Sequence, residues 1–163
     1  ASDVYKRQIH PSGAAVEYTD AGEAVKFCNA VGADALAVAI GNAHGLYTGE
    51  PHLHFDILAE IHGRLPVPLV LHGGTGIGEA DIQRCVRNGI RKVNVATATF
   101  RAVAEHVRLL YADGHPESYF TLQDTEAAGA YENVKKHIFM FGSAGKAAQK
   151  SISPLSEDKK WDT

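Results

Sequence analysis

Apolar residues along this chain follow two patterns, short unbroken runs and longer segments with helical spacing. Unbroken runs cover residues 35–40 and 67–71, whereas residues 92–97 alternate polar with apolar side chains. A short apolar run predicts a strand buried in a parallel sheet, and the alternation predicts a third strand with one polar face. The pattern therefore predicts three strands.

Helical spacing fills the segments before, between and after these strands. The first helix starts at Thr19 or Asp20, where Glu23 completes a capping box, and it stops at Gly32, which suits the left-handed C-terminal position. Other helices are predicted over residues 55–62, 79–88 and 125–139, and a longer one that Thr97 or Thr99 caps extends to Tyr111. The strongest apolar stripe lies on the fourth helix and consists of Phe100, Val103, Ala104, Val107, Leu110 and Tyr111.

The resulting order of elements, α, β, α, β, α, β, α, α, indicates the fold class. Crossovers of βαβ length call for an α/β protein with a parallel sheet. Three strands are few for a doubly wound sheet, and a (β/α)₈ TIM barrel takes roughly 250 residues, more than the 163 present. The sequence therefore predicts either a small sheet or part of a barrel.

Composition narrows the classes of function. The net charge is -3 with no basic cluster, which argues against a nucleic-acid partner. The apolar runs are too short to span a bilayer and no secretory h-region appears, so a cytoplasmic protein with no membrane partner is expected. Cys28 and Cys85 fall on apolar helix faces, where we expect small core residues rather than a disulfide or a nucleophile.

Histidine, glycine and polar side chains follow all three predicted strands. The first strand leads into His44 and Gly45, the second into His72 and a glycine-rich loop, and the third ends within residues 94–97. Ligands of parallel α/β proteins collect at the carboxyl ends of the strands. The presence of such residues after all three strands is stronger evidence for a site than any one loop.

Two histidines at neighbouring strand ends could share a metal ion. Zinc accepts imidazole nitrogen at about 2.0–2.1 Å, but a catalytic zinc needs about three protein ligands. The alternative is that His44 and His72 are polar strand ends hydrogen-bonded to backbone. His52 and His54 also have ligand-like spacing, but on a polar loop before a helix, where a structural role is favoured.

The glycine-rich loops offer a second kind of site. Backbone N–H groups at a helix start can bind phosphate with little need for arginine, and Thr75, Asn94 and Thr97 add polar side chains. The alternative is a tight turn that needs glycine for its backbone angles. Lys92 is interpreted as a partly buried structural lysine, with a Schiff-base role as the less favoured alternative.

Together these motifs resemble the class II (zinc-dependent) fructose- and tagatose-bisphosphate aldolases, the ketose-bisphosphate aldolase family. The matching segments are residues 18–20, 34–41, 43–45, 68–77, 92–97 and 141–147. The resemblance covers residues 16–147 and implies the C-terminal portion of a (β/α)₈ TIM barrel, about three β/α units plus terminal helices. Residues 1–15 would be a lead-in, of which residues 2–8 look foreign, and residues 148–163 a polar tail.

The resemblance also implies roles for particular residues. His44 and His72 would be two of three zinc ligands, Asn94 would contact the enediolate side of the substrate, and Lys146 would lie near a second phosphate. The cofactor would be Zn²⁺, with a monovalent cation as a second ion. The glycerone phosphate part of the substrate would be surrounded by Gly45, Gly73, Gly74, Thr75, Asn94, Val95, Ala96 and Thr97.

The implied reaction is the cleavage of a ketose 1,6-bisphosphate, fructose or tagatose, to glycerone phosphate and glyceraldehyde 3-phosphate by a homo-oligomer, dimer or tetramer. The family's catalytic Asp with its neighbouring His ligand, and a loop Glu, should precede Val16. Nothing in residues 1–15 matches them, and Asp3 lies in the segment that looks foreign. The chain alone is therefore expected to be inactive.

Two other functions stay open at this point. The first is a non-catalytic half-barrel that binds phosphate or metal and needs a partner chain. The second is an unrelated phosphate-binding barrel of the isomerase or synthase type. An Asp-His pair on a strand upstream would favour the aldolase over both.

Overall fold

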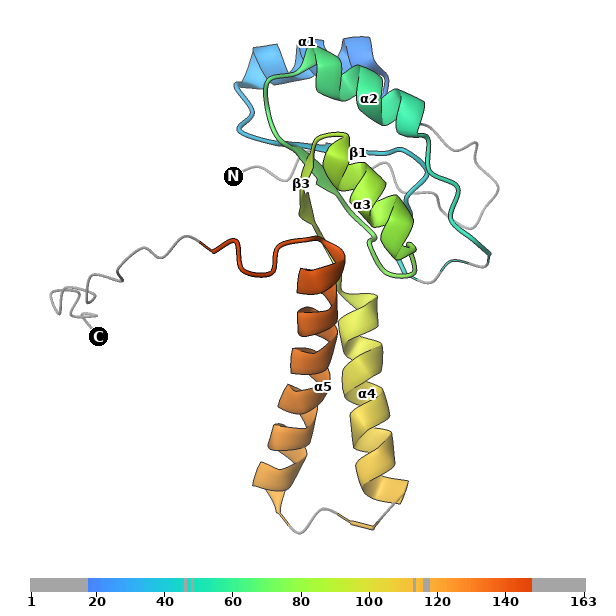
Figure 1. The fold of residues 1–163 in the computed structure, drawn as a ribbon, viewed down its shortest axis with the longest axis vertical. Helices are drawn as coiled ribbons and strands as arrows, with labels where there is room; N and C mark the ends of the chain where they lie inside the picture. The colour runs from blue at the N-terminus through green and yellow to red at the C-terminus, as the bar shows by residue number, and fades with distance from the viewer. Residues whose placement is uncertain (1–17, 46, 48, 113, 116–117, 148–163) are drawn as a thin grey trace, which may run out of the picture.

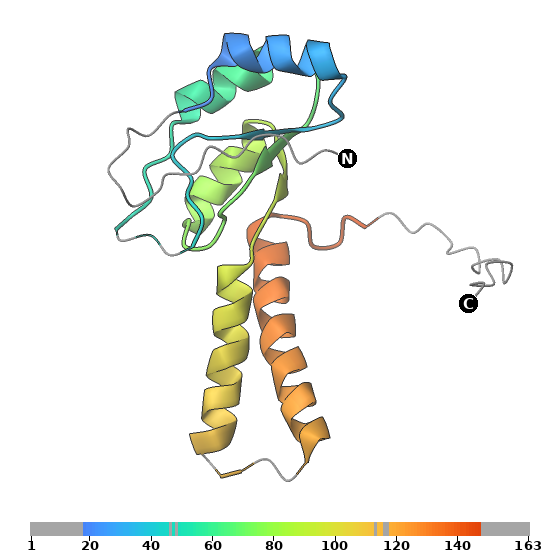
Figure 2. The same ribbon diagram turned by 180° about the vertical axis from the view of Figure 1, so that it is seen from behind.

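The computed structural model describes residues 18–45, 47, 49–112, 114–115 and 118–147. Figure 1 shows a layered body of strands and helices from which a helical hairpin projects, and the view from behind in Figure 2 shows the same separation. The predicted lead-in over residues 1–15 and the tail over residues 148–163 lie outside the described residues. In chain order the elements are α1 (Ala21–Val31), β1 (Leu36–Val38), α2 (Phe55–Arg64), β2 (Leu69–Leu71), α3 (Glu79–Arg87), β3 (Ile90–Val93), α4 (Thr97–Ala112) and α5 (Tyr119–Met140).

The three strands form one parallel sheet in the order β1-β2-β3. Leu36 of β1 faces Leu69 of β2, and Leu69 in turn faces Ile90 of β3. Parallel neighbours need a crossover connection, and α2 and α3 supply the two that this sheet requires. The prediction of an α/β fold with a parallel sheet is confirmed.

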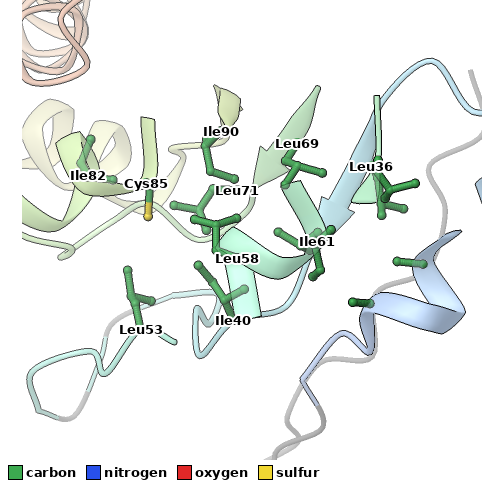
Figure 3. Packing of buried hydrophobic residues seen from close by; sticks show 14 of the residues in the cluster. Leu36, Ile40, Leu53, Leu58, Ile61, Leu69, Leu71, Ile82, Cys85 and Ile90 are labelled. Atoms are coloured by element: carbon green, nitrogen blue, oxygen red, sulfur yellow. The ribbon is translucent and has the colours of Figure 1, made fainter. Parts of the chain in front are cut away.

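One apolar cluster joins α1, α2 and α3 to the sheet (Figure 3). Leu36 and Val38 of β1 are buried in it, whereas Ala37 between them is half-buried. β2 is buried throughout, as its unbroken apolar run predicts. The most deeply buried side chains are Ile40, Leu58, Ile61, Leu69, Leu71, Ile82, Ile90 and Cys85.

Both cysteines belong to this cluster and neither is in a disulfide. Burial raises the pKa of the Cys85 thiol to about 11; the carboxylate of Asp81 adds to this shift and Arg84 opposes it. Burial also raises the pKa of Cys28. The thiols are therefore neutral core groups, as predicted.

The predicted ends of the first helix are confirmed. The Asp20 side chain accepts a hydrogen bond from the backbone N–H of Glu23 at 2.8 Å, which satisfies one of the free donors of the first turn. Gly32 ends α1 in the left-handed conformation with φ 63°. Thr19, the other candidate cap, instead holds β1, because its Oγ1 accepts from the N–H of Ala39.

The predicted third strand over residues 92–97 is wrong in its bounds, since β3 runs over Ile90–Val93. The register between β2 and β3 shifts and leaves Arg91 as an extra residue between Ile90 and Lys92. A bulge breaks the alternation of faces, so counting by twos misses the start of the strand.

The last helix starts earlier than the predicted residue 125. The Ser118 side chain accepts from the N–H of Thr121 at 3.2 Å and caps α5 one residue before Tyr119. Ser118 is a typical N-cap residue, and the sequence interpretation overlooked it. Among the described residues, no helix is both long enough and apolar enough to cross a bilayer.

The hairpin of α4 and α5 is held together by a close backbone approach. A Cβ added at Gly129 would come within 2.9 Å of the carbonyl oxygen of Ala102 and of the Cα of Val103. Asn133 of α5 donates its side-chain N–H to Thr99 Oγ1 of α4 at 2.8 Å. A glycine at this crossing therefore lets the two helices pack closely.

The predicted apolar stripe of α4 forms a helix but no buried face. No residue of α4 is buried, and Gly129 is the only buried residue of α5. Phe100, the first residue of the stripe, is 69% exposed. The reason is geometric: α4 projects from the body (Figure 1), and among the described elements α5 is the one that packs along it.

Candidate active site at the carboxyl ends of the strands

The loops that follow β1 and β2 are tied together by Asn42. Its Oδ1 accepts from the N–H of Ile40 at 2.8 Å, and its Nδ2 donates to the carbonyl oxygen of His72 at 3.1 Å. One amide thus fixes the end of the first strand against the end of the second. Sequence reasoning missed Asn42; its place two residues before His44 is the only signal that could have suggested it.

Tyr47 is a second tie that sequence reasoning missed. Its hydroxyl accepts from the N–H of Ala43 at 2.9 Å and donates to the carbonyl oxygen of Gly73 at 3.2 Å. Burial is the largest cause of the raised pKa of Tyr47. A tyrosine on a loop has no periodic partner in the sequence, so its role appears only once the two loops are seen together.

The glycines after β2 are required by close packing. A Cβ at Gly73, whose φ is +65°, would lie 1.8 Å from the carbonyl oxygen of Ala43, and one at Gly74 would lie 2.7 Å from a methyl group of Val93. The Gly74 N–H donates to the carbonyl oxygen of Asn94 at 3.0 Å. Gly73 and Gly74 therefore let the loops after the three strands touch one another. This agrees with the interpretation of the glycines as turn residues, and it also forms the edge of the sheet that a ligand would contact.

His44 and His72 lie next to each other on this edge. Their ring centroids are 5.5 Å apart, with the ring planes inclined at 55°. His44 is exposed, whereas His72 is half-buried. The predicted proximity of the two imidazoles is thus present in the structure.

Asn94 connects His72 to Lys92. Asn94 Nδ2 lies 3.1 Å from Nδ1 and 3.3 Å from Nε2 of His72, and Lys92 Nζ lies 2.6 Å from Asn94 Oδ1. An ammonium group only donates, so the Asn94 oxygen must face Lys92 and its NH₂ must face His72. Lys92 itself is exposed rather than partly buried as predicted; its strand, β3, is an edge strand of the described sheet.

Part of the predicted phosphate-binding set lies at the start of α4. Thr75 is only 6% exposed, and its Oγ1 accepts from the N–H of Ala98 at 3.1 Å. The loop after β2 thereby caps a helix that follows β3. Around this link the structure places Val95 and Thr97, both half-buried, and Ala96, which is exposed; Gly45 follows His44 with φ +89°.

Three other predicted residues lie apart from this edge or make structural contacts. Lys146 is exposed beyond α5, and in the part of the chain that the structure describes no hydrogen bond or ion pair joins its side chain to the strand-end loops. His54 packs on Tyr18 and on His52, with ring centroids 4.3 and 5.2 Å apart. His54 also precedes α2 directly, which agrees with the structural interpretation.

The donor set fits zinc only in part. His44 and His72 are nitrogen ligands of the kind that zinc prefers, and their rings are close enough to face one ion. Within the described residues no group of three or more His, Cys, Asp or Glu side chains could hold a metal. The described residues therefore offer two ligands where about three are needed.

The family is settled by comparison with known sequences. The model of the family described as fructose-bisphosphate aldolase class II matches residues 5–146. The chain belongs to this class II aldolase family. The match starts upstream of the motifs that carry the resemblance.

Individual relatives agree with membership of the aldolase family. The Escherichia coli protein YdjI is 38% identical over 134 residues, 82% of this chain and 47% of that protein. A 6-phospho-5-dehydro-2-deoxy-D-gluconate aldolase of Bacillus licheniformis is 39% identical over 136 residues, 81% of this chain and 46% of that enzyme. The chain thus spans about half the length of the curated relatives that it matches.

Solved aldolase structures share the fold. The crystal structure of the YdjI aldolase from Escherichia coli K12 aligns with a TM-score of 0.70 at 39% identity, covering 80% of this chain and 48% of that one. A proposed fructose-1,6-bisphosphate aldolase from Coccidioides immitis aligns with a TM-score of 0.70 at 30% identity, covering 79% and 45%. The arrangement of a parallel sheet and helices is therefore that of this family.

Proposed function

We propose that the protein to which this chain belongs cleaves a ketose 1,6-bisphosphate, fructose or tagatose, to glycerone phosphate and glyceraldehyde 3-phosphate with the help of zinc. The observation that carries the proposal is the pair His44 and His72, 5.5 Å apart at neighbouring strand ends of a class II aldolase chain. In this proposal β1, β2 and β3 are the last three strands of a (β/α)₈ barrel, whose ligands meet at this edge.

The two histidines would hold the ion together with a third ligand from outside the described residues. Bound zinc would act as a Lewis acid that polarises the ketone of the substrate. The chain's own contribution is to fix the two imidazoles, through the bond from Asn42 to the His72 carbonyl and the Tyr47 bridge between the two loops. A shared ion needs this fixed spacing because zinc tolerates little variation in the distance to nitrogen.

Asn94 would change partner when His72 becomes a ligand. A neutral imidazole that uses one nitrogen for a metal carries its proton on the other, so both ring nitrogens then lose their capacity to accept. The Asn94 NH₂, which faces His72 here, would have to turn elsewhere while Lys92 retains its oxygen. It would then be able to donate to an oxygen of the substrate, the role that the family resemblance implies.

The proposed phosphate site lies where the glycine loop meets the start of α4. In this proposal Gly45, Gly73, Thr75 and residues 94–97 would surround the bound phosphate. Remote binding energy at the phosphate would hold the reacting carbons against the metal and raise the rate through orientation. The general base that takes the proton of the departing alcohol would come from outside the described residues.

A second substrate is favoured by two relatives of this chain, which carry the same enzyme name. The Bacillus licheniformis enzyme is named for 6-phospho-5-dehydro-2-deoxy-D-gluconate, whose ketone lies beside a phosphorylated carbon as it does in the ketose bisphosphates. The strand-end loops of this chain would meet that shared part of either substrate. Parallel assays on fructose 1,6-bisphosphate, tagatose 1,6-bisphosphate and the gluconate derivative decide between them by kcat/KM.

Metal binding by the chain tests the proposed zinc pair. Titration with Co²⁺, followed by its visible absorption, should give one site that His44→Ala or His72→Ala abolishes. His62→Ala, at an exposed position on α2, should leave the titration unchanged. Binding that survives both strand-end substitutions would refute the shared site.

Activity separates the catalytic from the non-catalytic alternative. The 163-residue chain with Zn²⁺ should not cleave fructose bisphosphate, because in this proposal its described residues supply two of about three zinc ligands and the general base comes from elsewhere. A longer version that includes upstream sequence should cleave it. Zinc binding without cleavage by the longer protein would favour the half-barrel that needs a partner chain.

A further inference from the structure

Asn94 has a fixed backbone, but its side-chain amide could point in either of two directions. The backbone N–H of Asn94 donates to the carbonyl oxygen of Leu71 at 2.9 Å, and its carbonyl oxygen accepts from the N–H of Gly74 at 3.0 Å. The end of β2 and the loop after it therefore hold Asn94 on both sides. The oxygen and the NH₂ group of an amide are nearly alike in shape but opposite in hydrogen bonding, so the neighbouring side chains decide which of them faces the site.

His72 does not decide that direction by itself. A neutral imidazole carries one N–H and one bare nitrogen, so it can donate to an amide oxygen or accept from an amide NH₂ group. Asn94 Nδ2 lies at similar distances, 3.1 and 3.3 Å, from the two ring nitrogens of His72. Each direction of the amide can therefore be matched by one tautomer of the imidazole.

Lys92 decides the direction, because an ammonium group only donates. Asn94 follows β3 directly, two residues after Lys92, so the two side chains leave the same face of the sheet. Lys92 Nζ lies 2.6 Å from Asn94 Oδ1, a short bond of the kind that a charged donor makes. Among the residues that the structure describes, no carboxylate forms an ion pair with Lys92. Its charge therefore acts on the Asn94 oxygen.

The bond from Lys92 matters most when His72 binds a metal ion. The imidazole then carries its proton on the nitrogen that does not bind the metal, and this N–H attracts the oxygen of a neighbouring amide. Without Lys92, the Asn94 amide could turn its oxygen towards His72, and its NH₂ group would be lost to the site. A charged donor binds an oxygen about twice as strongly as a neutral donor does, so Lys92 keeps it.

We propose that Lys92 is a positioning residue, which holds the Asn94 oxygen and so leaves the Asn94 NH₂ group to donate to an oxygen of the substrate. The donor role rests on the proposed aldolase function, whereas the fixed direction of the amide does not. This role differs from both interpretations that the sequence suggested for Lys92, a partly buried structural lysine and a Schiff base. Lys92 acts through Asn94 and forms no covalent bond.

The bond itself can be measured in the longer protein that includes upstream sequence, freed of metal. NMR should detect a scalar coupling across the hydrogen bond, between Lys92 Nζ and the side-chain carbonyl carbon of Asn94. The NH₂ signals of Asn94 should shift in Lys92→Met. They should not move in Lys26→Met, which removes an exposed lysine of α1. Either an absent coupling or NH₂ signals that Lys92→Met leaves unmoved would overturn the fixed direction of the amide.

Kinetics of the same longer protein with Zn²⁺ test the donor role. Lys92→Met should lower kcat about ten- to a hundredfold with little change in KM, because a misplaced donor loses an interaction that is made in the transition state. Lys92→Arg, which keeps a charged donor, should retain most of the activity, and Lys26→Met should match the wild type. A rise in KM alone would indicate a lysine that attracts the anionic substrate, and it would overturn the positioning role.

A double-mutant cycle separates positioning from a merely structural role. Once Asn94→Ala has removed the amide, Lys92→Met should change kcat by less than about twofold, since the two residues act as one unit. Losses that multiply would show that Lys92 acts independently of Asn94, and they would refute the inference. If the wild-type protein cleaves none of the proposed substrates, the proposed function fails and the donor role with it. The NMR measurement then still decides whether Lys92 fixes the amide.

Discussion

Helices of the body and of the hairpin have the same apolar periodicity, but only the body buries its apolar faces. In the body, the apolar faces of α1, α2 and α3 close over the sheet, and Leu58, Ile61 and Ile82 have no exposed surface. In the hairpin, α4 buries no residue and α5 buries only Gly129. The body is thus stabilised by burial of apolar side chains. The hairpin depends mainly on the packing of α4 against α5, with Met140 and Phe141 as its contact to the core, and leaves aromatic side chains exposed.

Truncating a core side chain should have the largest effect on stability. Leu58→Ala leaves a cavity at the centre of the body and should lower the free energy of unfolding by about 2–5 kcal/mol. Leu109→Ala, at a 48% exposed site on α4, should change it by less than about 0.5 kcal/mol. Urea unfolding compares the two, and similar losses would contradict the difference between the regions.

Filling the helix crossing should have an intermediate effect that is confined to the hairpin. Alanine at position 129 gains about 1 kcal/mol of helix propensity, but its methyl would meet the Ala102 carbonyl oxygen at 2.9 Å. Gly129→Ala should therefore cost about 1–3 kcal/mol overall, with faster hydrogen exchange in α4 and α5 and unchanged exchange in β2.

A matched glycine on α2 provides the control for that substitution. Nothing lies within 4 Å of a Cβ at Gly63, so Gly63→Ala should stabilise the protein by about 0.5–1 kcal/mol. If both substitutions stabilise, the close approach of α4 to α5 at Gly129 is not as tight as the structure has it.

Removing the hydroxyl that joins the first two strand-end loops should have a smaller effect. Tyr47→Phe loses the bonds to the N–H of Ala43 and the carbonyl of Gly73, at a cost of about 1 kcal/mol. Because these loops carry His44 and His72, Co²⁺ should also bind more weakly. Tyr111→Phe, on the exposed side of α4, is the control for both measurements and should change neither.

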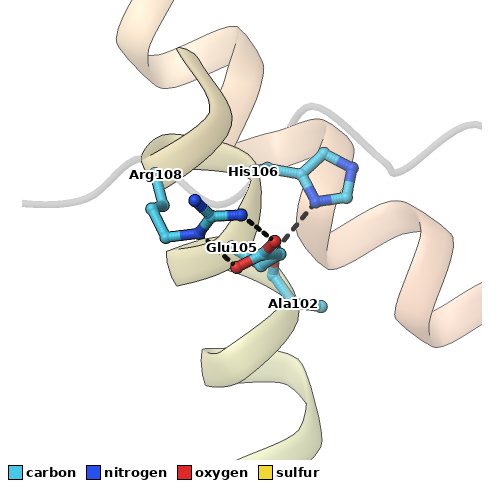
Figure 4. A network of polar contacts seen from close by, with 4 residues as sticks. All are labelled: Ala102, Glu105, His106 and Arg108. Atoms are coloured by element: carbon cyan, nitrogen blue, oxygen red, sulfur yellow. Dashed lines mark hydrogen bonds and ion pairs between the residues drawn. The ribbon is translucent and has the colours of Figure 1, made fainter. Parts of the chain in front are cut away.

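The smallest effect is expected on the surface of α4, where Figure 4 shows Arg108 bound to Glu105. Arg108 donates to both carboxylate oxygens of Glu105, at 2.8 and 2.6 Å, and this bond lowers the pKa of Glu105. A lowered carboxyl pKa stabilises the fold above the unfolded pKa of about 4.3, and the contribution disappears as pH falls through the folded value.

The matching test compares the wild-type chain with Glu105→Gln across pH. Both groups are exposed, so any difference in thermal stability should be small at neutral pH and should vanish in acid or in high salt. A difference that grows as the pH falls would contradict this account of the pair.

Local sequence patterns predicted most of the body. Asp20 and Gly32 gave the ends of α1, and two unbroken apolar runs gave β1 and β2, because capping and burial leave signatures within a few residues. The bulge at Arg91 and the cap at Ser118 shifted two element boundaries. The exposure of the α4 stripe could not be predicted, since periodicity identifies an apolar face but not what covers it.

The candidate site was predictable as a location but not as a set of contacts. Glycine and histidine at successive strand ends located the edge, and the structure places His44 beside His72. The roles of Asn42 and Tyr47 were not predicted, because each bonds to backbone atoms of a residue far along the chain and such bonds leave no periodic pattern in the sequence. The chemical roles of the site residues stay predictions.

The hydrogen bond between Thr75 and Ala98 uses a backbone N–H that could otherwise bind an anion. The N–H groups at a helix start are the donors that an anion would use, yet here the Ala98 N–H is already bound to Thr75 Oγ1. The Gly74 N–H is likewise bound to the Asn94 carbonyl. These two N–H groups hold the loops together and therefore do not donate to a phosphate. Binding a phosphate through them would require the bonds between the loops to break.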